Sequence, residues 1–444
     1  MDVTLHSKTN INESSQALAE EIPVAALPSG SSLYSDSQSV LRSGPRSDIR
    51  SKPHSDPHSE PQSDPQSDPQ SDPQSDPMML ILVIGMVGFG LLMVYSSSFI
   101  YAQERTGSGF SFIKKQLLFA GVGMLTLLAT ARINYRKWFD WAPTVFGLSI
   151  FLLALVMIPG VGAKVGGAQR WLRMGGINFQ PSEFAKFAVI LFIARQLERK
   201  RGRLHTLPAG VISHFLVSLP IFLLLLLQPD FGTTVMISVV IFALIFLAGV
   251  PKRFLAGALL AGGMVGSWLA LGTAYRRARL MTFLDPWTDP GGKGFQILQS
   301  LVGLHQGRIW GVGLGNGKEK LLYLPEAHND FIFAVIGEEL GFLGVAGVAL
   351  AYLYFVYRGL RIAWSAERDF EDRYGMLIAA GITLALGLQG FVNMAVVLGL
   401  LPTKGLTLPF ISYGGSALVV DLFAVGILLS VARGPQSRQS GSST

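Results

Sequence analysis

The stretch MMLILVIGMVGFGLLMVYSSSFIY occupies residues 78–101 and contains no charged residue. A helix of about 20 apolar residues crosses the hydrocarbon core of a bilayer, so this stretch predicts a transmembrane helix. Nine further runs follow, at residues 112–131, 140–159, 181–197, 209–227, 231–250, 254–273, 331–357, 375–399 and 416–432. The sequence therefore predicts an all-α polytopic integral membrane protein of about ten transmembrane helices. Its largest loop, which is extracytoplasmic, lies between the seventh and eighth helices.

Charge is divided unevenly between the first 77 residues and the rest of the chain. Residues 1–77 hold 5 basic and 12 acidic residues, a net −7, and the remainder holds 31 basic and 17 acidic residues, a net +14. The cations of the remainder lie at the ends of apolar runs, which excludes a nucleic-acid partner. Because the chain has no cysteine, disulfides, cysteine-bound zinc and thiol catalysis are also excluded.

The composition predicts three parts. Residues 1–77 contain repeats of Ser-Asp-Pro-Gln type from Ser55 onward, and a proline at every fourth position forbids a regular helix. We interpret 1–77 as a disordered acidic cytoplasmic tail, either a docking arm or a dispensable extension. Residues 78–433 form the ten-helix membrane domain, and 434–444 form a short disordered tail.

The orientation rests on the density of basic residues, because their number does not decide it. With both termini inside, the inside connections hold 16 basic residues and the outside segments hold 15. Residues 195–203 concentrate five basic residues in one short connection, and short loops carry the orientation signal. We therefore expect both termini in the cytoplasm, with the long polar segments 160–180, 274–330 and 400–415 on the outer face.

The first candidate for chemistry is Asp330, where the long outer segment meets an apolar run. One interpretation is an N-cap for a helix that begins at Phe331. The other is a general base, because an acid beside apolar residues at the membrane rim can have a raised pKa. Glu326 and His328 precede it and are candidates for substrate binding.

Further candidates lie at the ends of other spans. Glu183 and Lys186 are three residues apart on one helix face and form either a helix start with a local ion pair or a functional intramembrane pair. Gln228 and Asp230 flank a proline between two spans, where the alternative to binding is a capped tight turn.

The remaining candidates are two cations with aromatic or polar neighbours. Arg170 and Trp171 form either an interfacial anchor or a site that stacks on a sugar and pairs with a phosphate. Lys404, in a segment broken by Pro and Gly, either snorkels to the interface or pairs with a phosphate. Ser412 of the same segment is a further candidate for substrate binding. Together these residues indicate an anionic amphipathic substrate such as a lipid-linked phosphate, but they do not distinguish an enzyme from a transporter.

Five long motifs resemble the SEDS family (shape, elongation, division, sporulation) of bacterial cell-wall proteins. They are INFQPSEFAK (177–186), LLQPDFGTT (226–234), MTFLDPWTDPGGKGFQILQS (281–300), YLPEAHNDFIFAVIGEELG (323–341) and LLPTKGLTLPFISYGGSAL (400–418). The resemblance covers 78–432 and is nearer to the division type than to the elongation type. It departs from the usual pattern at Asn329, where Thr is frequent, and at Ala417, where Ser is frequent.

The resemblance implies a peptidoglycan glycosyltransferase that polymerises lipid II on the outer face of the cytoplasmic membrane at the division septum. The family's essential acid maps onto Asp330, and the Trp of its first large outer loop maps onto Trp171. The implied partners are a class B penicillin-binding protein transpeptidase and other division membrane proteins.

We hypothesise an inverting transfer in which Asp330 takes the proton of the acceptor sugar's 4-hydroxyl. Arg170, Lys186 or Lys404, with or without a divalent cation (Mg²⁺ or Mn²⁺), would stabilise the departing pyrophosphate. Two other functions stay open: a lipid II flippase, and a non-enzymatic scaffold that recruits the partner transpeptidase.

Overall fold

The computed structural model describes residues 76–434, except 166–167, 175–176, 293, 320–323 and 325–326. Nearly all of the two predicted tails, 1–77 and 434–444, lies outside these residues, and so does Glu326. Those three expectations stay predictions.

A helix occupies each of the ten predicted spans. These helices are α1 (Pro77–Thr106), α2 (Ser111–Arg132), α3 (Arg136–Val156), α4 (Pro181–Arg199), α5 (Ser213–Leu227), α6 (Phe231–Leu247), α7 (Lys252–Leu271), α10 (Ile332–Phe370), α11 (Arg373–Val397) and α12 (Gly415–Ala432). Eight of them, with α5 extended by a π-helical turn at Pro208–Ile212, have the length and composition to cross a membrane alone. The other two are α6, which is short, and α4, which carries charge. The predicted polytopic helical fold is confirmed.

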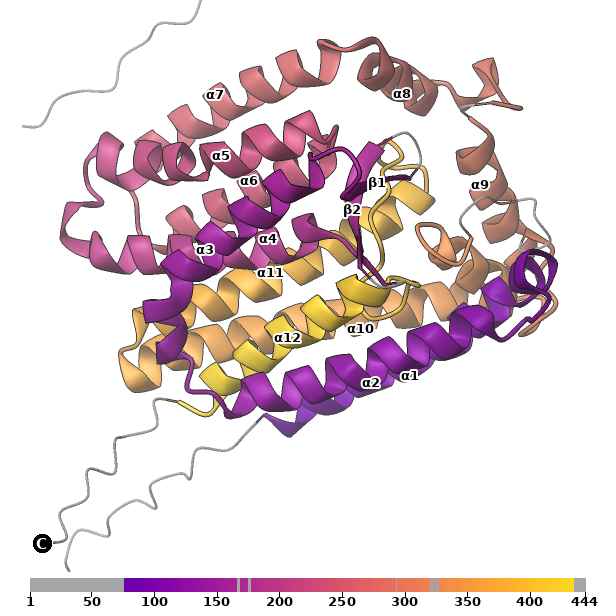
Figure 1. Cartoon of the computed structure of the whole chain (residues 1–444), viewed down its shortest axis with the longest axis horizontal. Helices are drawn as coiled ribbons and strands as arrows, with labels where there is room; N and C mark the ends of the chain where they lie inside the picture. The colour runs from indigo at the N-terminus through magenta and orange to yellow at the C-terminus, as the bar shows by residue number, and fades with distance from the viewer. Residues whose placement is uncertain are drawn as a thin grey trace, which may run out of the picture. The chain divides into compact units, whose positions relative to one another are not determined.

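The helix α11 lies at the centre of the bundle. It packs against α4, α6, α10 and α12, while α2 packs against α12 and α3 against α4 (Figure 1). By contrast, α7 lies at the edge of the bundle and contacts α6, α8 and the π-helical turn before α5 (Figure 1). Buried polar side chains are therefore expected on α4 and α11, where neighbouring helices supply hydrogen-bond partners.

The long connections gather at one end of the bundle (Figure 1). One connection contains an antiparallel sheet with the order β1 (Gly162–Val165), β2 (Ala168–Met174) and β3 (Ile177–Phe179). The longest contains α8 (Ala274–Leu284), a 3₁₀ turn (Pro286–Thr288) and α9 (Phe295–Gly307). The sequence predicted these segments on one face but did not predict their internal structure.

The helix α10 is broken at Gly341. Gly341 has φ 68° and ψ −161°, a conformation that is almost confined to glycine. The backbone at the break is paired with the segment after α9: Phe342 N–H donates to the Arg308 carbonyl at 2.8 Å, and Val312 N–H donates to the Glu338 carbonyl at 2.9 Å. Irregular backbone at membrane depth is tolerated when protein satisfies it in this way.

Candidate active site at the end of the bundle with the long connections

Residues 399–414, between α11 and α12, form a re-entrant segment that folds back onto α11. Leu400 N–H donates to the Ala395 carbonyl at 2.8 Å. Further along, the Ser412 hydroxyl accepts a hydrogen bond from Leu408 N–H at 2.8 Å, and the Ser412 carbonyl accepts one from Gln116 at 3.2 Å. The predicted binding residue Ser412 is buried here and shapes the turn of this segment.

Asp330 lies against this re-entrant segment. Its backbone carbonyl accepts a hydrogen bond from Asn393 Nδ2 at 2.9 Å. A Cβ atom added to Gly405 would stand 3.0 Å from Asp330 Oδ2, so the carboxylate approaches the backbone at the glycine closely. The capping interpretation placed the N-cap of this helix at Asp330. The N-cap of α10 is instead Phe331, so Asp330 stands one residue before it.

Lys404 is the neighbour of Gly405 in the chain and lies against the first turn of α6. A Cβ atom at Gly232 would stand 3.1 Å from Lys404 Cδ. Burial lowers the pKa of the Lys404 amine; the Asp230 carboxylate opposes this effect, and the Arg279 guanidinium adds to it. The re-entrant segment thus approaches Asp330 through Gly405 and the first turn of α6 through Lys404.

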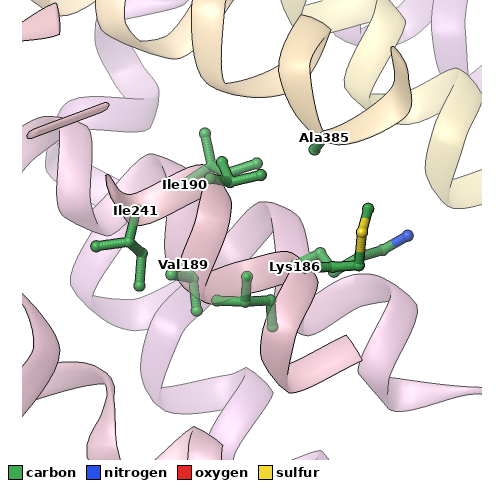
Figure 2. Close-up of a pocket in the computed structure, with 8 residues that line it drawn as sticks. Lys186, Val189, Ile190, Ile241 and Ala385 are labelled. Carbon is green, nitrogen blue, oxygen red and sulfur yellow. The ribbon is translucent and has the colours of Figure 1, made fainter. Parts of the chain in front are cut away.

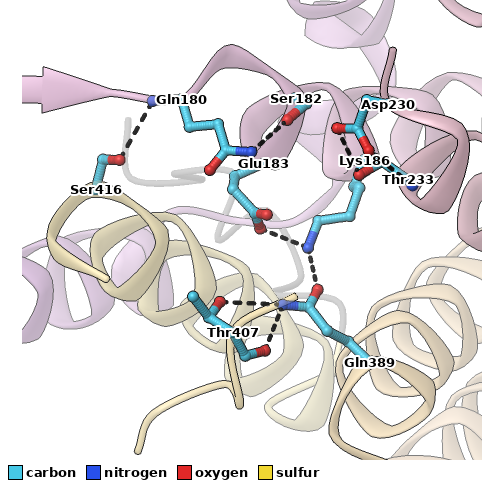
Figure 3. Close-up of polar contacts among 9 residues, drawn as sticks. All are labelled: Gln180, Ser182, Glu183, Lys186, Asp230, Thr233, Gln389, Thr407 and Ser416. Atoms are coloured by element: carbon cyan, nitrogen blue, oxygen red, sulfur yellow. Dashed lines mark hydrogen bonds and ion pairs between the residues drawn. The ribbon is translucent and has the colours of Figure 1, made fainter. Parts of the chain in front are cut away.

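Glu183 and Lys186 form a buried ion pair of 2.6 Å in the first turns of α4. Lys186 Nζ also donates to Gln389 Oε1, and Gln389 Nε2 donates to the Thr407 carbonyl at 3.0 Å (Figure 3). The pair is therefore connected through α11 to the re-entrant segment. Asp421 of α12 is buried and interacts electrostatically with both members of the pair.

A small cavity adjoins this pair between α4, α6 and α11 (Figure 2). It holds about 10 Å³, roughly the room of one water molecule, and aliphatic side chains and Met236 line it together with Lys186. Figure 2 shows the Lys186 amine directed away from the aliphatic lining. The cavity is too small for a sugar, and the pair contacts α11 through the hydrogen bond from Lys186 to Gln389.

Arg170 of β2 connects the sheet to the turn between α5 and α6. Its Nε donates to the Gln228 carbonyl at 2.9 Å, and its Nη2 donates to the Pro229 carbonyl at 2.5 Å. Gln228 Nε2 donates to the Leu153 carbonyl at 2.8 Å. Asp230 is the N-cap of α6 and accepts from Thr233 N–H at 3.2 Å, which confirms the capped turn that the sequence offered as one interpretation.

His328 and Trp171 lie on two different segments, the turn before α10 and the strand β2. The ring centroid of His328 lies 5.2 Å from that of Tyr101 and 4.9 Å from that of Phe112, and its carbonyl accepts a hydrogen bond from Tyr413 N–H at 3.0 Å. Trp171 is partly buried in β2 opposite Ala163. His328 is thus held by aromatic packing two residues before Asp330.

Within the described ranges, no three His, Asp or Glu side chains are placed so that they could hold a metal ion. Mg²⁺ commonly uses one or two carboxylates and takes its other ligands from substrate phosphates and water. Asp330 could supply one such carboxylate, so the residues fit a cation held mainly by its substrate.

Three residues of this region were not selected from the sequence: Gln389, Asn393 and Asp421. Each is a polar side chain within a predicted apolar span. Polar groups inside a membrane span are costly and mark functional positions, so that signal was available. It did not indicate which backbone groups they would contact.

The family model for the cell cycle proteins FtsW, RodA and SpoVE matches residues 77–437. The chain belongs to this family. It is 45% identical over 361 residues to the probable peptidoglycan glycosyltransferase FtsW of Trichlorobacter lovleyi, covering 80% of this chain and 93% of that one. It is 40% identical over 359 residues to stage V sporulation protein E of Bacillus subtilis, covering 80% and 96%.

Two solved structures share the fold. One, described as the structural coordination of polymerization and crosslinking by a peptidoglycan synthase complex, aligns with a TM-score of 0.65 and 32% identity over 81% of this chain and 98% of that one. The rod shape determining protein RodA of Thermus thermophilus aligns with a TM-score of 0.58 and 29% identity, covering 81% and 97%. The family that the five motifs predicted is confirmed.

Proposed function

We propose that this chain is a peptidoglycan glycosyltransferase of the FtsW type, which polymerises lipid II with Asp330 as general base. The observation that carries the proposal is the approach of the Asp330 carboxylate to Gly405, next to Lys404. This approach places the base beside the segment that carries the cation, one residue along the chain from Lys404. A transfer from a sugar pyrophosphate requires both groups.

The reaction is a displacement at the donor's anomeric carbon. The 4-hydroxyl of the acceptor sugar gives its proton to Asp330 as its oxygen bonds to that carbon. The bond between the carbon and the pyrophosphate oxygen breaks with inversion, and undecaprenyl pyrophosphate leaves with the bonding electrons. Lys404, in its protonated form, pairs with the departing phosphate, and the nearby Arg279 adds positive charge.

The setting of the reaction is also part of the proposal. Both termini lie in the cytoplasm, so the site opens on the outer face of the cytoplasmic membrane, at the division septum. A class B penicillin-binding protein crosslinks the strands, alongside other division membrane proteins. One related solved structure is described as a complex that coordinates polymerization with crosslinking, which supports such a partner.

A divalent cation, Mg²⁺ or Mn²⁺, would neutralise pyrophosphate charge beside Asp330. Polymerisation should then fall when EDTA is added and return with Mg²⁺ or Mn²⁺ but not with Na⁺ at equal ionic strength. Full activity in EDTA would show that the cations of the chain suffice.

The test is the product length formed from lipid II by purified protein, with and without the partner transpeptidase. Asp330→Asn keeps the shape of the side chain but removes the base, and we expect a loss of about 10²–10⁴-fold. Glu104→Gln, an exposed acid near the end of α1, is the matched control and should retain activity. Near wild-type polymerisation by Asp330→Asn would refute the assignment.

The same preparations separate the two other functions. A flippase moves fluorescent lipid II across a vesicle bilayer without lengthening glycan. A scaffold supports division in cells that carry Asp330→Asn. Either result, together with unchanged product length, would replace the glycosyltransferase proposal.

A further inference from the structure

Asn393 of α11 is a buried amide that contacts two segments of the candidate site. It is 1% exposed, and its Nδ2 contacts two backbone carbonyls that belong to different segments. One is the Asp330 carbonyl, at 2.9 Å, and the other is the Leu406 carbonyl, at 2.6 Å. A single amide group therefore joins the segment of the base to the segment of Lys404.

The chemistry of these contacts fixes the orientation of the amide. Carbonyl oxygens only accept hydrogen bonds, so the group that faces both must be the NH₂, which has one hydrogen for each. The Asn393 Oδ1 atom has no partner among the described residues.

We call the pair of hydrogen bonds from Asn393 Nδ2 to these two carbonyls the clasp. A second amide makes a similar contact one turn away on the same helix face. Gln389, four residues before Asn393, donates to the Thr407 carbonyl at 3.0 Å and accepts from Lys186. Residues four apart on a helix lie side by side. The two amides thus hold the consecutive carbonyls of Leu406 and Thr407, and only Asn393 also reaches Asp330.

The segment that carries Asp330 has a second contact with the re-entrant segment, because Tyr413 N–H donates to the His328 carbonyl at 3.0 Å. Residues 328–330 are therefore tied to the re-entrant segment at two points. One tie uses backbone alone, and the other depends on a side chain that can be replaced.

We propose that Asn393 is a positioning residue for the transfer, which sets the place of the Asp330 carboxylate relative to Gly405 and Lys404 by clasping the two carbonyls. The inference rests on the proposed role of Asp330 as base. Without the clasp, residues 328–330 and 404–407 can separate, and the base and the cation lose their common geometry. A misplacement of about 1 Å in such a constellation can lower a rate by about 10²-fold.

Steady-state polymerisation of lipid II by the full chain with its partner tests this role. Asn393→Ala removes the clasp, and we expect kcat to fall about 10- to 100-fold while KM stays within about threefold. Asn393→Asp keeps the volume but turns an oxygen toward both carbonyls, and we expect an equal or larger loss of kcat. A KM change without a kcat change in these variants would overturn the proposal.

Thr383→Val is the matched control. Thr383 is fully buried on the same helix, its hydroxyl has no partner among the described residues, and the replacement keeps its shape. Its kcat should equal that of the wild type. All rates are normalised to the monodisperse fraction from size exclusion. If Asn393→Ala folds poorly, the kcat of Asn393→Asp decides the test.

Asp330→Asn in the same series separates the two proposals. If Asp330→Asn is inactive and both Asn393 variants keep kcat within twofold of the wild type, the positioning role is wrong and the base stands. If Asp330→Asn is active, the base assignment fails, and with it the clasp as a catalytic device.

Discussion

The most apolar 18-residue windows of α7 and α11 have the same mean hydropathy but opposite surroundings. In the most apolar 18 residues of each, 6% of α7 is buried, against 78% of α11. The helix α11 carries the buried polar residues Thr383, Gln389 and Asn393, while the corresponding part of α7 is aliphatic and rich in glycine. Hydropathy therefore predicts that a helix spans the membrane, and its polar residues indicate whether it faces protein.

The physical reason is that lipid tails are as apolar as leucine. Helices in a bilayer gain no hydrophobic energy by associating, so close packing and hydrogen bonds decide which helices pack together. The leucines on the surface of α7 cost nothing where they meet lipid. The amides of α11 require partners, and Lys186 of α4, the Asp330 carbonyl before α10 and the re-entrant segment supply them.

The largest expected effect comes from breaking the ion pair that faces α11. Lys186→Met leaves Glu183 buried without its cation, and removal of one partner of a buried pair costs about 3–5 kcal/mol. The melting temperature in detergent should fall sharply. Adding Glu183→Gln removes the unpaired charge and should restore most of the loss, whereas an unchanged melting temperature for Lys186→Met alone would contradict the buried pair.

A glycine pair tests the comparison directly. A Cβ at Gly390 of α11 would stand 2.3 Å from the Tyr352 ring, whereas a Cβ at Gly262 of α7 meets nothing within 4 Å. Gly390→Leu should destabilise by about 1–3 kcal/mol through overpacking, and Gly262→Leu should not destabilise. Equal melting temperatures for the two variants would show that α7 is packed as α11 is.

A carboxyl group in the segment after α9 adds a dependence on pH. Burial, with a smaller contribution from the Glu338 carboxylate, raises the pKa of Glu319 from 4.5 to about 7. Because the folded-state pKa of Glu319 is raised, its protonated carboxyl group contributes stability that is fully present below pH 4.5 and is lost as pH rises through 7. The melting temperature should fall by a few degrees between pH 5 and 8, and the fall should be smaller in Glu319→Gln. Parallel profiles would exclude Glu319 as the titrating group.

The smallest effect is expected on the exposed face of α7. Trp268 is 73% exposed, so Trp268→Ala should change the free energy of unfolding by less than about 0.5 kcal/mol. A thermal melt in detergent beside Gly390→Leu measures the contrast. A shift as large as that of Gly390→Leu would mean that α7 contacts protein through this face.

The sequence predicted the ten spans because long apolar runs leave few alternatives to a helix. It also selected Asp330 and Lys404 individually, since charges at the ends of spans are conspicuous. It did not predict their approach at Gly405, which depends on the fold of the re-entrant segment.

Other features left weak signals in the sequence. The strands β1 to β3 have three to seven residues, which is too few for a clear alternation of polar and apolar positions. The helices α8 and α9 are separated by Pro and Gly, which masked their helical period. The break at Gly341 interrupts an apolar run without a proline, and only its φ and ψ angles reveal it.

That break has a mechanical consequence. The limb of α10 from residue 342 to 370 is about 44 Å long at about 1.5 Å per residue, longer than the hydrocarbon core of about 30 Å. Rocking a straight rod of that length by about 1° moves its far end by about 0.8 Å. The chain turns at Gly341 and is anchored there to the segment after α9, so the two limbs of α10 do not form one straight rod of this kind. Asp330 is therefore not joined to the long limb by one continuous straight helix.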